Sequence, residues 1–129
     1  MKRQPEFELQ KCVCSYLRAA HPSILFMSDT IASLKLTKWQ AVRNSQIQKP
    51  GFKTPDVLVF CPKGKYSGLF IELKTESPYK LNGGLKSNAH IQEQFKTIEK
   101  LRELGYYADF AWNFKDIVSL INRYLNEKL

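Results

Sequence analysis

The sequence predicts an α/β fold in which helices cover a β-sheet, within one domain that spans residues 1–129. Helix-like and strand-like patterns follow one another in the order α-β-(loop)-β-β-α-β-α. Two central runs are apolar almost throughout, which is typical of strands buried on both faces. A chain of 129 residues, 43% of them hydrophobic, is large enough for one core and too short for two.

The first helix is predicted over residues 5–20, because a proline suits its first turn and His21-Pro22 ends the pattern. One broad helix face is apolar and contains Leu9, Cys12, Val13, Tyr16, Leu17 and Ala20. Glu6 projects into this face, so its carboxylate either faces a site or interacts with the helix dipole in the first turn. A short strand is predicted next, over residues 23–27.

The segment from Thr30 to Thr54 is basic and without clear periodicity, so a long loop is predicted. It has no acidic residue, and its basic and aromatic side chains are Lys35, Lys38, Trp39, Arg43, Lys49, Phe52 and Lys53. Such a loop could follow a phosphate backbone and stack on a base. The equal alternative is a solvated flap whose Trp39 packs down on the core.

The two apolar runs, residues 57–60 and 69–71, are predicted to be neighbouring strands joined by a turn at residues 62–65. The polar segment 75–87 follows, with Pro78 and Gly83-Gly84 as turn signals, and could form a mobile rim.

A helix is predicted over residues 88–104 and is closed by Gly105. Its apolar stripe consists of Ile91, Phe95, Ile98 and Leu101. Gln94 projects into this stripe with His90 one turn before it, and a buried amide without partners costs about 1–3 kcal/mol. A strand over residues 106–112 and a last helix to residue 126 complete the chain. Asn113 and Asp116 resemble a capping pair for that helix, whose predicted apolar face is Ile117, Leu120, Ile121, Tyr124 and Leu125.

Composition narrows the functional classes. The net charge of +8 favours polyanionic partners, with nucleic acid first and an acidic membrane surface second. No apolar run approaches the ~20 residues that span a bilayer, and no signal-like stretch follows the N-terminus, so a cytoplasmic protein is expected. Three cysteines without ligand-like spacing are most simply reduced thiols.

The chemistry is concentrated around the two central strands. Asp56 stands before the first, and Glu72 and Lys74 stand at the end of the second. Residues i and i+2 of a strand share a face, so Glu72 and Lys74 point the same way while Leu73 turns into the core. If the strands pair, Asp56 reaches that face too. Two carboxylates suit Mg²⁺, and an ammonium group suits a water or phosphate beside it, which predicts metal-assisted phosphodiester hydrolysis.

Other site chemistries find little support. His21 and His90 are too few and too separated for a zinc cluster or a histidine-based triad, and there is no P-loop or Rossmann glycine pattern.

With these residues in place, nearly the whole chain resembles a PD-(D/E)XK nuclease, and more narrowly a VRR-NUC domain of the compact phage or bacterial kind. The motifs that carry the resemblance are Glu6-x-x-x-Gln10, Gly51-Phe52-Lys53-Thr54-Pro55-Asp56, Glu72-Leu73-Lys74, and Gln94 followed by Leu101 and Gly105. The resemblance implies a restriction-endonuclease-like core of three layers, with a central mixed β-sheet flanked by helices.

The resemblance also implies roles for individual residues. Asp56 and Glu72 would bind Mg²⁺ or Mn²⁺, helped by the Leu73 carbonyl, with Glu6 as an additional acidic ligand or outer group. Lys74 would position or deprotonate the attacking water. Gln94 would orient Lys74 or the scissile phosphate. The residues expected to contact nucleic acid are Lys35, Lys38, Trp39, Arg43, Lys49, Lys53 and His90.

Three functional hypotheses follow. The first is a metal-dependent DNA endonuclease, with selectivity for branched or flapped DNA left open. The second is a nucleic-acid-binding module that uses the same fold without catalysis. The third is an assembly or regulatory protein whose acid cluster is a structural ion-pair network. The combination of Asp56, Glu72, Lys74 and Gln94 favours the first hypothesis, and a homodimer is expected because two sites would cut two strands.

Overall fold

The computed structural model describes residues 5–29 and 35–129. Its elements are α1 (Pro5–Ala20), β1 (Phe26–Ser28), α2 (Lys38–Ile47), β2 (Val57–Val59), β3 (Leu69–Leu73), α3 (Ala89–Glu103), β4 (Tyr107–Ala111) and α4 (Phe114–Leu125). The order confirms the predicted α/β pattern, except that α2 lies where a loop was expected.

The four strands form one mixed sheet in the order β1-β2-β3-β4. The pairs β1–β2 and β2–β3 are antiparallel, whereas β3 and β4 are parallel. Parallel neighbours need a crossover, and α3 supplies it between β3 and β4. The sheet is therefore mixed, as predicted.

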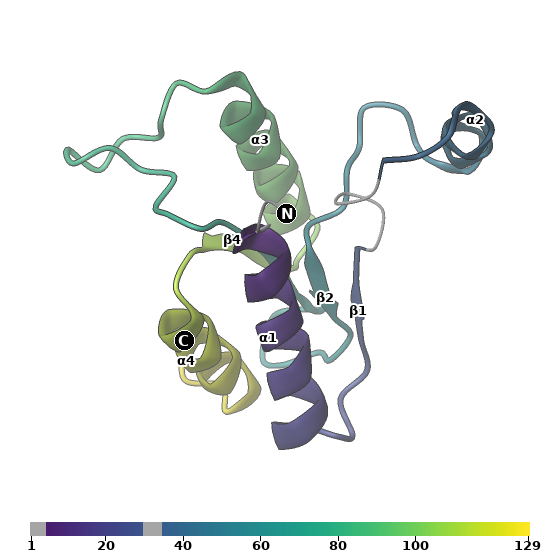
Figure 1. Cartoon of the computed structure of the whole chain (residues 1–129). Coiled ribbons are helices and arrows are strands. Elements are labelled where there is room, and N and C mark those ends of the chain that lie inside the picture. Colours follow the sequence, from purple (N-terminus) through teal and green to yellow (C-terminus); the bar gives the residue numbers. More distant parts are fainter. Residues whose placement is uncertain (1–4, 30–34) are drawn as a thin grey trace.

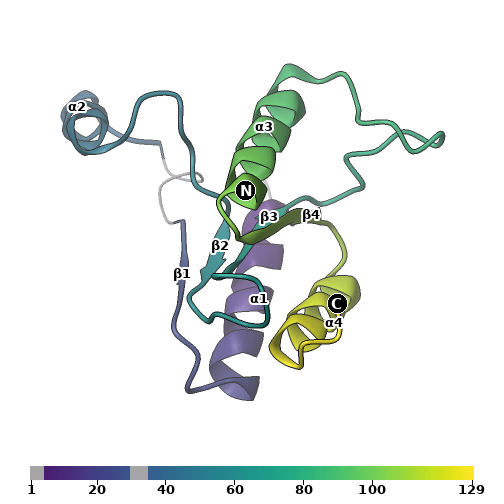
Figure 2. The ribbon, with the colours of Figure 1, turned by 180° about the vertical axis from the view of Figure 1, so that it is seen from behind.

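Helices cover both faces of the sheet and make three layers (Figures 1 and 2). On one face, α1 and α4 enclose the main core, which consists of Val13, Leu17, Val57, Val59, Leu69, Ile71, Leu73, Ala111, Ile117, Leu120, Ile121 and Tyr124. On the other face, α3 packs on Ala108 and Phe110 of β4 through Ile98 and Leu101. The predicted apolar faces of the three amphipathic helices thus point at the sheet.

Burial on both faces, predicted for the two central strands, is correct for β3 and only partly correct for β2, where Leu58 is half-buried between the buried Val57 and Val59. Leu69, Ile71 and Glu72 of β3 are all buried. In contrast, Met27 of β1 and Phe60, just after β2, expose 56% and 52% of their surface. The second core cluster, which contains the buried residues of α3, includes β4 residues and Phe70 of β3 and no described residue of β1 or β2.

The first strand is shorter and later than predicted. β1 consists of Phe26–Ser28, whereas the sequence pattern indicated residues 23–27. The chain needs the intervening residues to reverse direction after α1, and the Ile24 amide donates to the His21 carbonyl in that turn, at 3.0 Å. Pairing with β2 starts only at Phe26, which lies opposite Val59.

The prediction of a loop over residues 30–54 is wrong for its middle part, which forms α2, and its first residues, 30–34, lie outside the described part of the chain. Thr37 caps this helix through a capping box, since its hydroxyl accepts from the Gln40 amide and the Gln40 side chain accepts from the Thr37 amide. The helix has no buried residue, and its Trp39 is 78% exposed. Figure 1 shows α2 standing apart from the three layers. The alternative in which Trp39 packs on the core is therefore wrong.

The last two helices are capped as their sequences indicate. The Asn88 side chain accepts from the His90 and Ile91 amides. The Asn113 side chain accepts from the Lys115 amide, and Gly105 follows α3 with a φ of 96°. Within the described residues no helix is long and apolar enough to cross a membrane.

Candidate active site

Asp56 and Glu72 lie face to face where β2 begins and β3 ends. In the antiparallel pair, Val57 is opposite Ile71, so the next residue along each strand brings Asp56 opposite Glu72. The two carboxyl groups are close enough that Asp56 raises the pKa of Glu72. The two strands therefore bring together the acidic pair that the sequence pattern singles out.

The surroundings of the Glu72 carboxyl favour its protonated form. Only 8% of the residue is exposed, and burial is the largest of the causes that raise its pKa well above the ordinary value. The negative charge of Asp56 raises the pKa further, and Glu6 adds a smaller effect in the same direction, whereas Lys74 lowers it. Burial and the neighbouring acid therefore both favour the protonated form of Glu72.

Backbone groups fix the position of Asp56. The Leu73 amide donates to Asp56 Oδ2 at 2.8 Å, so β3 holds this carboxyl across the strand pair. Leu73 is buried with its side chain in the core, as predicted, and its contact to the site is this amide N–H. The Asp56 carbonyl accepts from the Asp29 amide at 3.0 Å and from Ser28 Oγ at 2.8 Å.

Gln94 reaches the acidic pair from α3. Its Nε2 donates to Glu72 Oε1 at 2.9 Å, so its partner is the carboxyl rather than Lys74. Its Oε1 is buried and has no hydrogen-bond partner among the described residues. A buried acceptor without a donor is unfavourable by about 1–3 kcal/mol, and it therefore marks a place where a water or a ligand donor would bind.

Lys74 lies next to the acids without a direct ion pair to a described carboxylate. Its amide donates to the Ala111 carbonyl at 2.9 Å, which continues the ladder between β3 and β4. Its Nζ lies 6.0 Å from the centre of the Phe110 ring, within cation–π range. Its positive charge favours the ionised form of Glu72. The ammonium group therefore acts on the acidic pair without forming an ion pair with either of its carboxyl groups.

Glu6 and His90 lie at the rim. Glu6, in the first turn of α1, is exposed rather than buried within the apolar stripe, because the first turn of α1 lies outside the core that the stripe covers. Its charge still acts on Glu72. His90 is exposed in the first turn of α3, one turn before Gln94. In residues 5–29 and 35–129, no three His, Cys, Asp or Glu side chains are grouped closely enough to hold a metal ion.

Within the described part of the basic segment, residues 35–54, α2 stands apart from the sheet and the helices that cover it (Figure 1). Lys35, Lys38, Arg43, Lys49 and Lys53 are all exposed. None of them forms an ion pair with a described residue, since the ion pairs between described side chains join Lys11 to Glu8, Lys86 to Glu76 and Arg102 to Asp109. Their charges are therefore available to an external anion.

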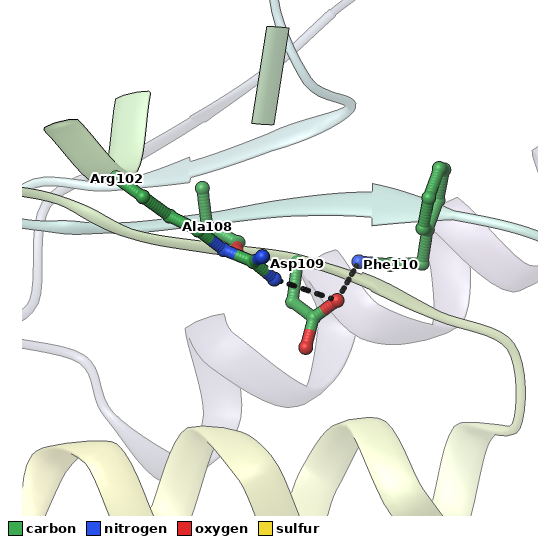
Figure 3. A network of polar contacts seen from close by, with 4 residues as sticks. All are labelled: Arg102, Ala108, Asp109 and Phe110. Atoms are coloured by element: carbon green, nitrogen blue, oxygen red, sulfur yellow. Dashed lines mark hydrogen bonds and ion pairs between the residues drawn. The ribbon is translucent and has the colours of Figure 1, made fainter. Parts of the chain in front are cut away.

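Asp109 provides a comparison with the acidic pair, because it forms an ion pair with Arg102 in the same fold. Asp109 of β4 accepts from its neighbouring Phe110 amide at 2.8 Å and pairs with Arg102 of α3 at 3.3 Å (Figure 3). Arg102 Nε also donates to the Ala108 carbonyl at 2.9 Å. Burial raises the pKa of Asp109, whereas the Phe110 amide and Arg102 lower it. No described cation pairs with Asp56 or Glu72 in this way, which argues against a purely structural role for their cluster.

A hollow of about 320 Å³ opens at the other end of β3 and β4. Its lining consists of Tyr66, Arg102, Tyr106, Tyr107 and Ala108. None of the residues predicted to act in the site lines it, so the candidate site rests on the acidic pair alone.

Two contributors to the site, Gln10 and Ser28, were not predicted as site residues. They connect α1 and β1 to the Asp56 backbone, with Gln10 Nε2 donating to Ser28 Oγ at 2.5 Å and to the Asp29 carbonyl at 2.9 Å. The spacing Glu6-x-x-x-Gln10 places both polar side chains on one face of α1, which is the signal that points to Gln10.

Comparison with known proteins supports the fold. No protein-family model matches the sequence, and no curated protein matches it significantly. The chain is similar to a solved structure of a VRR_NUC domain protein, with a TM-score of 0.62 and 22% sequence identity, over 97% of this chain and 91% of that one. At this level of identity the similarity concerns the fold: the α/β core with its four-stranded mixed sheet is VRR-NUC-like.

Proposed function

We propose that this protein, which has a VRR-NUC-like fold, is a metal-dependent endonuclease that hydrolyses phosphodiester bonds in DNA. The observation that carries the proposal is the acid pair Asp56–Glu72, which lies across β2 and β3 within the influence of Lys74 and has no ion pair to any described cation. A domain that only bound DNA would gain nothing from two acidic side chains placed together, because ionised carboxylates repel phosphate unless a cation lies between them.

The residues present fit a divalent cation. Mg²⁺ keeps several waters and is commonly bound by one or two carboxylates together with substrate phosphates, so a third carboxylate is not required. Asp56 and Glu72 would hold Mg²⁺ or Mn²⁺, with the Leu73 carbonyl as a further oxygen and Glu6 as an outer acidic group. When bound, the cation would polarise the phosphate and make a water more acidic.

The other side chains would orient the reactants. Gln94 holds Glu72 Oε1, which leaves the second Glu72 oxygen free to turn toward Asp56 or a cation. Its unpartnered Oε1 could accept from the attacking water or from Lys74. The Lys74 ammonium would offset negative charge on the phosphate as the reaction proceeds.

The DNA would contact the basic segment around α2 and the rim beside His90. Lys35, Lys38, Arg43, Lys49 and Lys53 supply exposed positive charge, and the exposed Trp39 supplies a ring that can stack on a base. Because stacking needs a base without a neighbour on one side, the proposal extends to a preference for branched or flapped DNA. A homodimer is part of the same proposal, since one small domain with one site cuts one strand.

The test is incubation with supercoiled, linear and branched DNA in Mg²⁺, Mn²⁺ or EDTA. We expect cleavage that needs the metal and is lost in Asp56→Ala and in Lys74→Ala, while both variants still bind DNA. Asp109→Asn is the matched control, since it changes an acid on β4 that is not part of the pair. Cleavage that persists in Asp56→Ala and Lys74→Ala would refute the assigned site.

A further inference from the structure

We infer that Gln10 and Ser28 are positioning residues that hold Asp56 in the geometry needed for cation binding, an inference that rests on the proposed function. Four segments of the chain meet at this point: α1 through Gln10, β1 through Ser28, the start of β2 through Asp56 and the end of β3 through Leu73. Neither Gln10 nor Ser28 touches the acidic pair's carboxyl groups in these contacts. They act through the Asp56 backbone.

The hydrogen bonds run in one direction. Gln10 Nε2 donates to Ser28 Oγ at 2.5 Å, and the Ser28 hydroxyl donates its single proton to the Asp56 carbonyl at 2.8 Å. Because Gln10 occupies an acceptor position of the serine oxygen, it directs the hydroxyl hydrogen toward Asp56. The second hydrogen of the Gln10 amide reaches the Asp29 carbonyl at 2.9 Å. Both N–H hydrogens of the Gln10 side-chain amide are therefore used in hydrogen bonds, one to the end of β1 and one to the residue that follows it.

The three bonds to Asp56 come from opposite sides. Its carbonyl accepts from Ser28 Oγ and from the Asp29 amide at 3.0 Å, and its carboxyl accepts from the Leu73 amide. Two of these donors are backbone amides, so Ser28 is the one of the three that a substitution can remove. A residue held at both its backbone and its side chain has little freedom, and that fixes the distance between its carboxyl and Glu72.

The same contacts fix α1 relative to the site. Gln10 lies one turn after Glu6 on the helix, and the charge of Glu6 already acts on Glu72. Partners that orient metal ligands commonly change metal affinity by about 10–100-fold when they are removed. Loss of the Gln10–Ser28 connection should therefore weaken cation binding more than it weakens the reaction at saturating cation.

The experiment uses Ser28→Val and Ser28→Thr, which have nearly the same shape and differ in the hydroxyl, together with Gln10→Ala. Binding of Mn²⁺ to the full chain is measured by calorimetry without DNA, and cleavage is measured as a function of Mn²⁺. We expect Ser28→Val and Gln10→Ala to raise the Kd for Mn²⁺ by about tenfold or more, and to keep the cleavage rate at saturating Mn²⁺ within about threefold of the parent. Ser28→Thr should bind Mn²⁺ like the parent.

Controls separate the inference from the proposed function. Gln92→Ala removes another glutamine that donates to a backbone carbonyl, that of Lys86, and should leave the Kd unchanged. Asp56→Ala should abolish Mn²⁺ binding; if it does not, the proposed metal site is wrong. If Asp56→Ala loses the cation whereas Ser28→Val and Gln10→Ala bind it like the parent, only the inference about positioning is overturned. Should Ser28→Val fail to fold, Gln10→Ala alone decides.

Discussion

Asp56 and Glu72 lie opposite each other where β2 begins and β3 ends, with Glu72 buried and its pKa raised by burial and by Asp56. Between pH 4.5 and its raised pKa, Glu72 keeps a proton that it would release in the unfolded chain. This relationship makes the stability of the protein depend on pH, and it gives the acidic pair a signature that can be measured without any substrate.

Glu72→Gln should remove much of that pH dependence. The pKa of Glu72 is raised above its ordinary value of 4.5, chiefly by burial, so the folded protein binds a proton that the unfolded chain has lost. The contribution of Glu72 to the free energy of unfolding is fully present below its ordinary pKa of 4.5. It falls as the pH rises above 4.5, by at most about 1.4 kcal/mol per pH unit. The amide introduced by Glu72→Gln would still accept from Gln94 but would not titrate.

The measurement is urea unfolding in EDTA at several values between about pH 5 and pH 8, a range that begins just above the ordinary pKa of a glutamate. The parent protein should lose stability over this range, and the variant should lose clearly less. Parallel profiles for the two proteins would mean that Glu72 is ionised in the folded state, contrary to the prediction.

Much of the fold could be predicted because the core leaves a periodic pattern in the sequence. Helices α1, α3 and α4 each bury one face, and their stripes therefore appear as apolar residues at helical spacing. α2 buries nothing, so it has no stripe, and only the Thr37–Gln40 capping box indicates it. The start of β1 could not be predicted either, because it depends on where pairing with Val59 begins.

The candidate site could be predicted in part for the same reason. Strand alternation places Glu72 and Lys74 on one face, and two adjacent strands suffice to bring Asp56 to it. The partners of the acids are a matter of tertiary structure. Gln94 is 22 residues from Glu72, and Ser28 is 28 residues from Asp56, so their hydrogen bonds leave no local pattern. Helical projection places Glu6 on the buried stripe, although the core does not extend to the first turn of α1.

Substitution of Lys38, Arg43 and Lys49 together by Ala should weaken DNA binding and reduce its dependence on salt. Each phosphate contact that is lost reduces the magnitude of the negative slope of log K against log salt by about 0.9. The slope of the triple variant should therefore be smaller in magnitude by up to about 2.7. The binding assay is fluorescence anisotropy in Ca²⁺ over a range of salt concentrations. A variant with Lys100, Lys115 and Lys128 replaced removes the same charge from exposed positions outside the basic segment. Equal slopes for the two triple variants would contradict a specific role for α2.

Thr37→Ala should loosen α2 without destabilising the rest of the protein. The substitution removes a capping box, which is worth about 1 kcal/mol to a helix, and a helix of this length is marginal by itself in water. Because α2 buries no residue, the global unfolding midpoint should stay the same. Hydrogen exchange of the amides in α2 should accelerate several-fold, whereas those of α4 should not change. A fall in the global midpoint of several degrees would mean that α2 contributes to the core.

Arg102→Ala should destabilise the protein by about 1 kcal/mol and expose the edge of the sheet. Tyr107 and Ala111 bond toward β3, so the backbone groups of Ala108 and Phe110 point to the outer edge of β4. Arg102 donates a hydrogen bond to the Ala108 carbonyl, and the Asp109 carboxylate accepts one from the Phe110 amide (Figure 3). Edge strands with free backbone groups associate with other edges, so the variant should self-associate more readily.

The pH dependence of this loss has a definite sign. Arg102 favours the ionised form of Asp109, whose pKa burial raises, so removing the arginine matters most where the carboxyl is ionised. The difference in unfolding free energy between parent and variant should therefore shrink as the pH falls toward 3.8, the ordinary pKa of the aspartate. Urea unfolding would measure the loss of stability in Arg102→Ala, and light scattering would measure its self-association. Arg18→Ala serves as control, because Arg18 donates to Ser15 on its own helix. Its free energy of unfolding should fall by less than half as much as that of Arg102→Ala. A difference that is constant with pH would show that Arg102 acts through the Ala108 carbonyl alone and that its pair with Asp109 contributes nothing.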